Sequence, residues 1–136
     1  MHKKISVSLG AMILMFGLLK FVDPFKTWYS VQIQTSGLPE ISYFSGIIGE
    51  IVVGLLLIFP FFLKNEKFKF QILSLASSAL VVMMVVATYV HLLPAVPAEV
   101  LPLKIKPPVI PIIFLFAAGY NLYLSFALRL SLEKQS

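Results

Sequence analysis

The sequence predicts an all-α protein, an antiparallel four-helix transmembrane bundle that forms a single membrane domain over residues 1–136. Of these residues, 59% are hydrophobic and only 12% are charged, whereas a soluble domain has roughly 25% charged residues. Apolar runs over 5–22, 41–63, 70–93 and 109–128 are long enough to cross a bilayer, which takes about 20 residues. Polar or proline-rich turns close each run, and spanning strands would need a closed barrel that this chain is too short to build.

Composition also excludes several classes of function. The formal charge of +5 does not indicate a nucleic-acid partner, because the basic residues lie between apolar runs instead of forming one stripe. The absence of cysteine excludes a disulfide framework, a redox CxxC pair and a thiolate metal site. Two histidines far apart in the chain do not make a zinc set, so we expect no metal. No phosphate loop or nucleophile elbow is present.

The first span, 5–22, is predicted to be a retained helix, since it is long for a signal peptide and no small-residue cleavage site follows. Its Gly10, Gly17 and Lys20 fall on one face, where the glycines permit close approach of another backbone. Asp23-Pro24 ends this helix, because proline disfavours a helical residue before it. The aromatic segment that follows suits the headgroup zone and predicts a short interfacial helix over 24–34.

The second span, 41–63, carries Glu50 deep inside its apolar run. An ionisable group at that depth usually faces the protein interior and has a partner. Small residues accompany it at helical spacing and form one packing stripe. The members of this stripe are Gly46, Gly49, Glu50, Val53, Gly54 and Leu57.

The third span, 70–93, follows a basic turn and presents a seam at alternating spacings of three and four. The seam comprises Ser74, Ser77, Val81, Met84, Thr88 and His91. Residues 94–111 contain six of the nine prolines, which predicts a rigid extended connector that folds over the bundle mouth. The fourth span, 109–128, carries Asn121 on its middle turns.

Loop charges predict the orientation. Seven basic residues fall on one side of the predicted bundle, namely Lys3, Lys4, Lys64, Lys67, Lys69, Arg129 and Lys134. Three fall on the other, namely Lys26, Lys104 and Lys106. We therefore expect an integral protein of the bacterial inner membrane with both termini in the cytoplasm.

The polar residues inside the spans predict a site. Lys20 and Glu50 point toward each other along the bundle axis, across a gap of about 9 Å between their backbones. We expect their charges to pair, in a structural or a functional role. Alone, His91 is an interfacial residue and Asn121 a helix–helix contact. Together, we expect these groups to line a pocket for a lipid-like molecule with a polar head. The predicted lining consists of Lys20, Tyr43, Gly46, Glu50, Thr88, His91 and Asn121. The alternative is that they satisfy one another and leave no room.

The chain resembles the DoxX-like family of small four-helix membrane proteins. The resemblance lies in Phe16-Gly17-Leu18-Leu19-Lys20, in Gly46 to Gly54 with Glu50, and in His91-Leu92-Leu93-Pro94. It implies a four-helix bundle in which Lys20 and Glu50 are the family's paired polar positions. It also implies a partner or subunit of a membrane redox system, such as a thiosulfate–quinone oxidoreductase, or an assembly factor like the animal relative that assists nicotinic receptor assembly.

Two functional hypotheses follow. The first is a non-enzymatic accessory protein that binds a membrane protein, a second copy of itself or a lipophilic small molecule within the bilayer. The second is a membrane subunit of a quinone-linked oxidoreductase, with Glu50 and His91 moving protons. The residues favour the first, because redox chemistry needs a cofactor to carry electrons and the chain offers no cofactor motif.

Overall fold

The computed structural model describes residues 1–135, which fold into five α-helices joined by turns and short 3₁₀ segments. The helices are α1 (His2–Leu19), α2 (Phe25–Ser36), α3 (Ile41–Ile58), α4 (Glu66–Leu92) and α5 (Val109–Gln135). The 3₁₀ segments are η1 (Phe59–Phe62), η2 (Ala98–Val100) and η3 (Pro102–Lys104). This described part of the chain contains no strand, which confirms the predicted all-α class.

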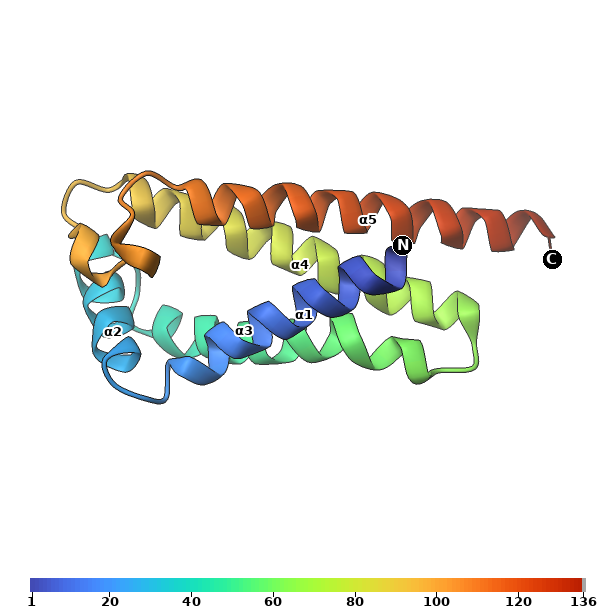
Figure 1. The fold of residues 1–136 in the computed structure, drawn as a ribbon, viewed down its shortest axis with the longest axis horizontal. Coiled ribbons are helices and arrows are strands. Elements are labelled where there is room, and N and C mark those ends of the chain that lie inside the picture. The colour runs from blue at the N-terminus through green and yellow to red at the C-terminus, as the bar shows by residue number, and fades with distance from the viewer. Residues whose placement is uncertain (136) are drawn as a thin grey trace.

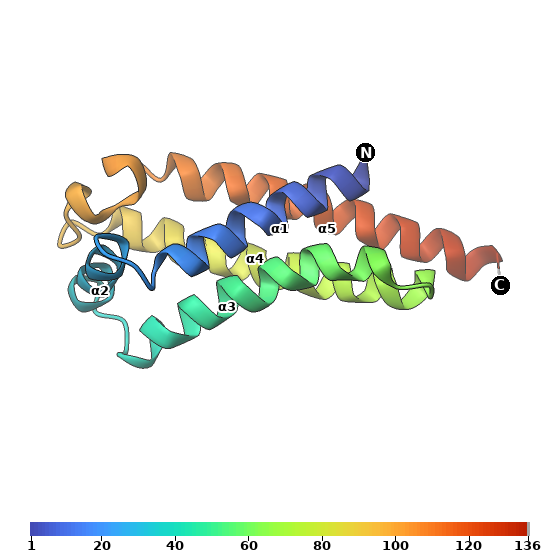
Figure 2. The same ribbon diagram turned by 60° about the horizontal axis from the view of Figure 1, so that its bottom comes forward.

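Four helical segments are long and apolar enough to cross a membrane, and they pack as an antiparallel bundle. The closest pairs are α1 with α3 and α4 with α5 (Figures 1 and 2). The N-terminus, the α3–α4 turn and the last turns of α5 lie at one end of the bundle (Figure 1). The helix α2 and the connector between α4 and α5 lie at the opposite end of the bundle (Figure 1). The predicted four-helix transmembrane bundle is therefore confirmed.

Two helices extend well beyond their predicted spans. The helix α4 begins at Glu66, because the Asn65 side chain accepts a hydrogen bond from the Phe68 backbone N–H and caps the first turn. The helix α5 continues to Gln135, seven residues beyond the predicted end of its span. Its polar last turns suit a helix that leaves the apolar zone, where Arg129 pairs with Glu133 four residues later.

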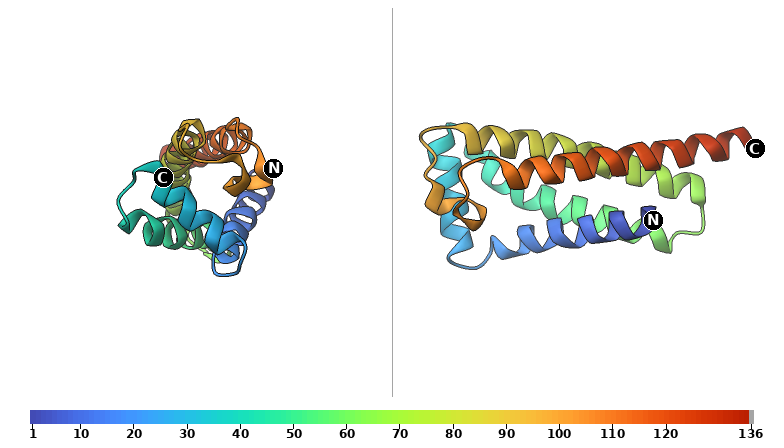
Figure 3. Two further views of the ribbon diagram at one scale, coloured as in Figure 1. Left: turned by 90° about the vertical axis from the view of Figure 1, so that its left-hand side faces the viewer. Right: turned by 45° about the horizontal axis from the view of Figure 1, so that its top comes forward.

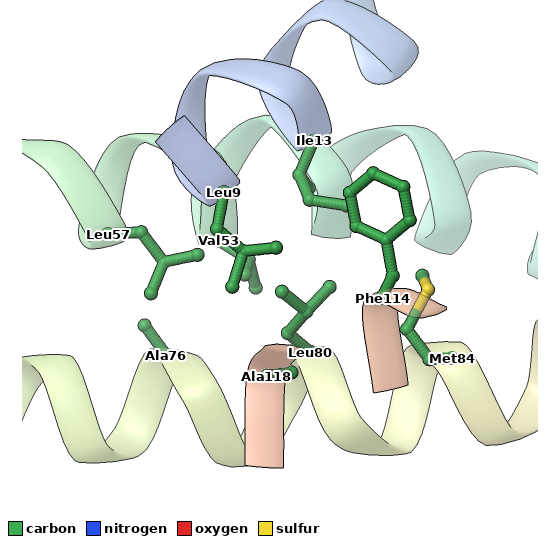
Figure 4. Packing of buried hydrophobic residues seen from close by; sticks show 9 residues of the cluster. All are labelled: Leu9, Ile13, Val53, Leu57, Ala76, Leu80, Met84, Phe114 and Ala118. Carbon is green, nitrogen blue, oxygen red and sulfur yellow. The ribbon is translucent and has the colours of Figure 1, made fainter. Parts of the chain in front are cut away.

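The main core lies between all four spanning helices at mid-depth (Figure 4). Its buried members are Leu9 and Ile13 of α1, Val53 and Leu57 of α3, Ala76, Leu80 and Met84 of α4, and Phe114 and Ala118 of α5. The buried residues of each helix recur every four residues, so each helix turns one stripe inward. The remaining large apolar side chains of the spans are mostly exposed and available to lipid tails.

A second layer covers one end of the bundle. We call it the cap, made of α2 and residues 93–108 (Figure 3). Val96, Val100 and Leu101 of the connector are buried against Val90 of α4 and beside Trp28 of α2. The Gln32 side chain donates a hydrogen bond to the Val100 carbonyl, which ties the two parts of the cap together. The helix predicted over 24–34 is thus present and docked on the bundle.

Candidate functional site

Lys20 and Glu50 form the ion pair that the sequence predicts. The Lys20 Nζ lies 2.6 Å from the Glu50 Oε1, and the two side chains are only 17% and 13% exposed. Lys20 follows directly after α1, whereas Glu50 lies on the middle turns of α3. Side chains lean toward the N-terminus of their helix, so two antiparallel helices bring these long side chains together. The predicted approach of the two charges is confirmed.

Tyr29 of α2 completes this group, although its segment was predicted only as a short interfacial helix over 24–34. Its ring centroid lies 3.9 Å from the Lys20 Nζ, a cation–π distance. The same ring stacks on Tyr43, with ring centroids 5.2 Å apart. Burial, and then the negative charge of Glu50, raise the pKa of Tyr29. We call Lys20, Tyr29, Tyr43, Gly46 and Glu50 the ion-pair group.

Gly46 belongs to this group because it leaves room for the Tyr29 hydroxyl. A Cβ on Gly46 would lie 1.8 Å from that oxygen, so no other residue fits without moving the ring. The same hydroxyl donates to the Ser42 carbonyl at 3.2 Å. Tyr29, Ile33 and Ser36 are the buried residues of α2 and share one face at helical spacing. That pattern is the signal that would have placed Tyr29 against the bundle.

His91 and Thr88 lie on the last turns of α4, apart from the ion-pair group. The His91 side chain is buried, and the backbone of residues 105–107 in the connector lies against it. The Thr88 hydroxyl donates to the Met84 carbonyl of its own helix at 2.8 Å. Across residues 1–135, no hydrogen bond, ion pair or ring contact joins either residue to Lys20 or Glu50.

Asn121 does not join the other predicted lining residues, and its placement there was wrong. It is fully buried, and its Nδ2 donates to the Ser77 Oγ at 2.9 Å and to the Ser6 Oγ at 3.3 Å. Ser6 and Lys20 are fourteen residues apart on α1, so their depths differ by about 20 Å. Asn121 therefore lies toward the end of the bundle that holds the N-terminus, opposite the cap.

Asn121 is the centre of a hydrogen-bonded network, which confirms its alternative prediction as a helix–helix contact, although its partners were not predicted. Ser6 donates to the Leu57 carbonyl at 2.9 Å, and Ser125 donates to the Asn121 carbonyl at 2.8 Å. His2 reaches the Ser125 Oγ at 2.9 Å. We call His2, Ser6, Ser77, Asn121 and Ser125 the serine–asparagine network. It links all four spanning helices with neutral groups, a common way to hold helices together in a membrane.

The seven residues predicted to line one pocket therefore do not lie together. Lys20, Tyr43, Gly46 and Glu50 share the ion-pair group, whereas Thr88, His91 and Asn121 lie in other places. One buried polar atom in each region has no hydrogen-bond partner within the described residues: the Glu50 Oε2, the His91 Nδ1 and the Asn121 Oδ1. These atoms are the remaining sites at which a water molecule or ligand could bind.

These features define the class: an integral membrane protein built as an antiparallel four-helix bundle, with an ion pair between its first two spans. A model of the DoxX family matches residues 7–92, more than half of the chain, and these include both members of the ion pair. The chain belongs to the DoxX family. No curated protein and no solved structure matches it.

Proposed function

We propose that this chain is a non-enzymatic accessory protein that binds an integral membrane protein partner. The observation that carries the proposal is the position of Tyr29 beside the Lys20–Glu50 pair. The Tyr29 hydroxyl occupies the position beside Gly46, and the Tyr29 ring covers the Lys20 ammonium. The buried charges are satisfied chiefly by the chain itself, which favours a structural role for the ion pair and leaves binding to the outer surfaces.

The cap provides the surface for such a partner. In η3, Leu103 is 80% exposed and has φ 53°, and Lys104 follows with φ 56°. Backbones of non-glycine residues rarely adopt positive φ, and such strained residues cluster at functional sites. The neighbouring turn is held firmly, because the Lys106 ammonium donates to the Leu93 and Val96 carbonyls. The proposed partner is a membrane protein that presents an apolar hollow for Leu103 and an acidic side chain for Lys104 on this side of the membrane.

Site-specific crosslinking in membranes tests this function. A photo-reactive residue at position 104 should form one reproducible adduct with a membrane protein, identified by mass spectrometry, and Leu103→Asp should abolish that adduct. The matched control places the same residue at Phe62, which is 77% exposed at the other end of the bundle. The same adducts from both positions, or adducts with lipid alone at position 104, would reject the proposal.

We also propose that the termini are cytoplasmic and that the cap faces the outside of a bacterial inner membrane. Seven of the basic residues outside the spans group with the termini and the α3–α4 turn, whereas three belong to the cap. Cytoplasmic loops are enriched in lysine and arginine, which supports this orientation. Labelling of single cysteines at Lys104 and Lys67 with an impermeant maleimide on intact cells tests it, since only position 104 should react.

A second candidate function is a quinone-linked subunit or a carrier of a lipophilic molecule, favoured by the buried Glu50 Oε2 that has no partner in residues 1–135. A carboxylate oxygen beside an ammonium can accept a hydrogen bond from a polar head. The Tyr29 ring would have to move away from Gly46 to admit one. Mass spectrometry of co-purified lipids separates the two functions: a quinone retained by the wild type and lost in Glu50→Gln supports the second candidate.

A further inference from the structure

We propose that a depression between α2 and the start of α3 binds the headgroup of a phospholipid that carries both a phosphate and a primary ammonium. The residues that line the depression are Asp23, Lys26, Thr27, Ser30, Val31, Gln34 and Tyr43. We call it the headgroup depression. It is separate from the buried Lys20–Glu50 pair and from the Leu103 turn, so it does not depend on the proposed partner.

The charges of the depression match such a headgroup. Asp23 and Lys26 line the same hollow, yet within residues 1–135 neither takes part in an ion pair. The Asp23 Oδ1 accepts a hydrogen bond from the Thr27 hydroxyl at 2.6 Å, which orients the carboxylate and leaves its second oxygen available. Two opposite charges that share a hollow without pairing complement a zwitterion, with Lys26 on the phosphate and Asp23 on the ammonium.

The depression also lies at headgroup depth. The spanning helix α1 ends at Leu19, and the spanning helix α3 begins at Ile41. The helix α2 lies between them, across the end of the bundle (Figure 3). Tyr29, Ile33 and Ser36 of this helix are buried, whereas Lys26 and Gln34 are exposed and line the depression. Amphipathic helices occupy this plane of a membrane, between headgroups and acyl chains.

An apolar stripe leads from the depression along α3 and indicates a lipid instead of a soluble zwitterion. The Tyr43 ring lines the hollow, and its edge contacts the Phe44 ring with centroids 5.3 Å apart. Phe44, Ile48, Val52 and Leu55 are all 46–58% exposed and follow helical spacing down the lipid-facing side. The stripe covers about 16 Å, close to the thickness of one leaflet of a hydrocarbon core of about 30 Å.

The chemistry of the two charges sets the preference among phospholipids. An ethanolamine headgroup supplies an N⁺–H donor to the Asp23 carboxylate and a phosphate to Lys26. A choline headgroup has no N–H donor, and a glycerol headgroup has no cation. We therefore expect the depression to bind an ethanolamine phospholipid more tightly than a choline or glycerol phospholipid. The difference in affinity should depend on Asp23.

Native mass spectrometry of the delipidated full chain tests the proposal, with phosphatidylethanolamine, phosphatidylcholine and phosphatidylglycerol of matched acyl chains added in turn. The wild type should bind one phosphatidylethanolamine about tenfold more tightly than the other two, the difference expected for one charge-assisted hydrogen bond. Asp23→Asn keeps an acceptor for Thr27 and should remove this preference. Lys26→Gln should weaken binding of all three lipids.

The controls carry matched charges outside the depression. Glu40→Gln removes an exposed acid near the same end of the bundle, and Lys67→Gln removes an exposed base at the opposite end; both should leave the lipid preference unchanged. Glycerophosphoethanolamine, which has the headgroup without acyl chains, should bind at least tenfold more weakly, because it cannot use the α3 stripe. A wild type with no preference among the lipids, equal effects of target and control variants, or full binding of the soluble headgroup would each overturn the proposal.

Discussion

Gly10 and Gly54 meet where α1 crosses α3, so closely that a Cβ on Gly10 would lie 2.7 Å from the Gly54 carbonyl oxygen. The reverse contact is similarly tight, since a Cβ on Gly54 would lie 2.9 Å from the Gly10 carbonyl oxygen and 2.8 Å from the Leu14 backbone nitrogen. Backbone atoms cannot swing aside as a side chain can. The close crossing of the first two spans therefore depends on both glycines.

Replacement of either glycine by alanine should destabilise the bundle. Gly10→Ala or Gly54→Ala forces the helices apart, and such overpacking costs about 1–3 kcal/mol. The control is Gly119→Ala on α5, where nothing lies within 4 Å of the added Cβ. It should be neutral or stabilising by up to about 1 kcal/mol, because alanine favours a helix. Thermal unfolding in detergent measures the stability of each variant. Equal changes in melting temperature at positions 10, 54 and 119 would contradict the close contact between α1 and α3.

The Lys20–Glu50 pair should show strong coupling between its two members. Glu50→Leu or Lys20→Leu alone leaves a buried charge without its partner, which typically costs about 3–5 kcal/mol. The double replacement should recover much of the loss if the pair is structural. Melting temperatures of the two single variants and the double variant give the coupling directly. Single variants as stable as the wild type would show that the pair does not hold the fold.

Tyr29 should make the stability sensitive to high pH. Burial and Glu50 raise its pKa in the folded chain, whereas tyrosine in the unfolded chain ionises near pH 10. The folded state therefore retains the proton, and the stability present below about pH 10 is lost as the pH rises toward the folded-state pKa. The fall in melting temperature between about pH 9 and pH 11 should be smaller in Tyr29→Phe than in the wild type. Tyr123→Phe, on an exposed residue of α5, should behave as the wild type.

The serine–asparagine network should contribute modestly and as one unit. Asn121→Leu removes both hydrogen bonds to the serines, and interhelical bonds of this kind average about 0.6 kcal/mol each. We expect a loss of about 1 kcal/mol, with little further loss when Ser77→Ala is added, because the two changes remove the same bond. Ser78→Ala, next in the chain but exposed, is the matched control. Fully additive losses would contradict the network.

The bundle and its ion pair were predictable because simple rules determine them. Apolar runs of sufficient length give the spans, and the opposite lean of side chains on antiparallel helices brings Lys20 to Glu50. The depth of Asn121 in the membrane was predicted wrongly, because it was counted from the predicted start of the fourth span, and helix ends are the least reliable part of such a prediction. The helix partners were also unknown: Asn121 finds Ser6 and Ser77 only because α5 packs between α1 and α4.

The position of Tyr29 over Lys20 could not be predicted from the sequence, although the spacing of Tyr29, Ile33 and Ser36 favours a buried face on α2. An aromatic residue on a short amphipathic helix suits the headgroup zone as well as a protein surface. The choice depends on how α2 docks, which is fixed by contacts far away in the chain, such as Gln32 with the Val100 carbonyl. Placement of Tyr29 over Lys20 is therefore a tertiary property, and the filled space beside Gly46 follows from it.

The core of Leu9, Ile13, Val53, Leu80 and Phe114 has an electrical consequence. On α1, α3 and α4 it separates the polar groups of the cap end from those of the opposite end. Ile13 lies between Ser6 and Lys20, Val53 between Glu50 and Leu57, and Leu80 between Ser77 and His91. A proton crosses a membrane protein along connected donors and acceptors, and this apolar layer interrupts the chain of them. Within residues 1–135, no hydrogen bond therefore connects the ion-pair group at the cap end with the serine–asparagine network at the opposite end.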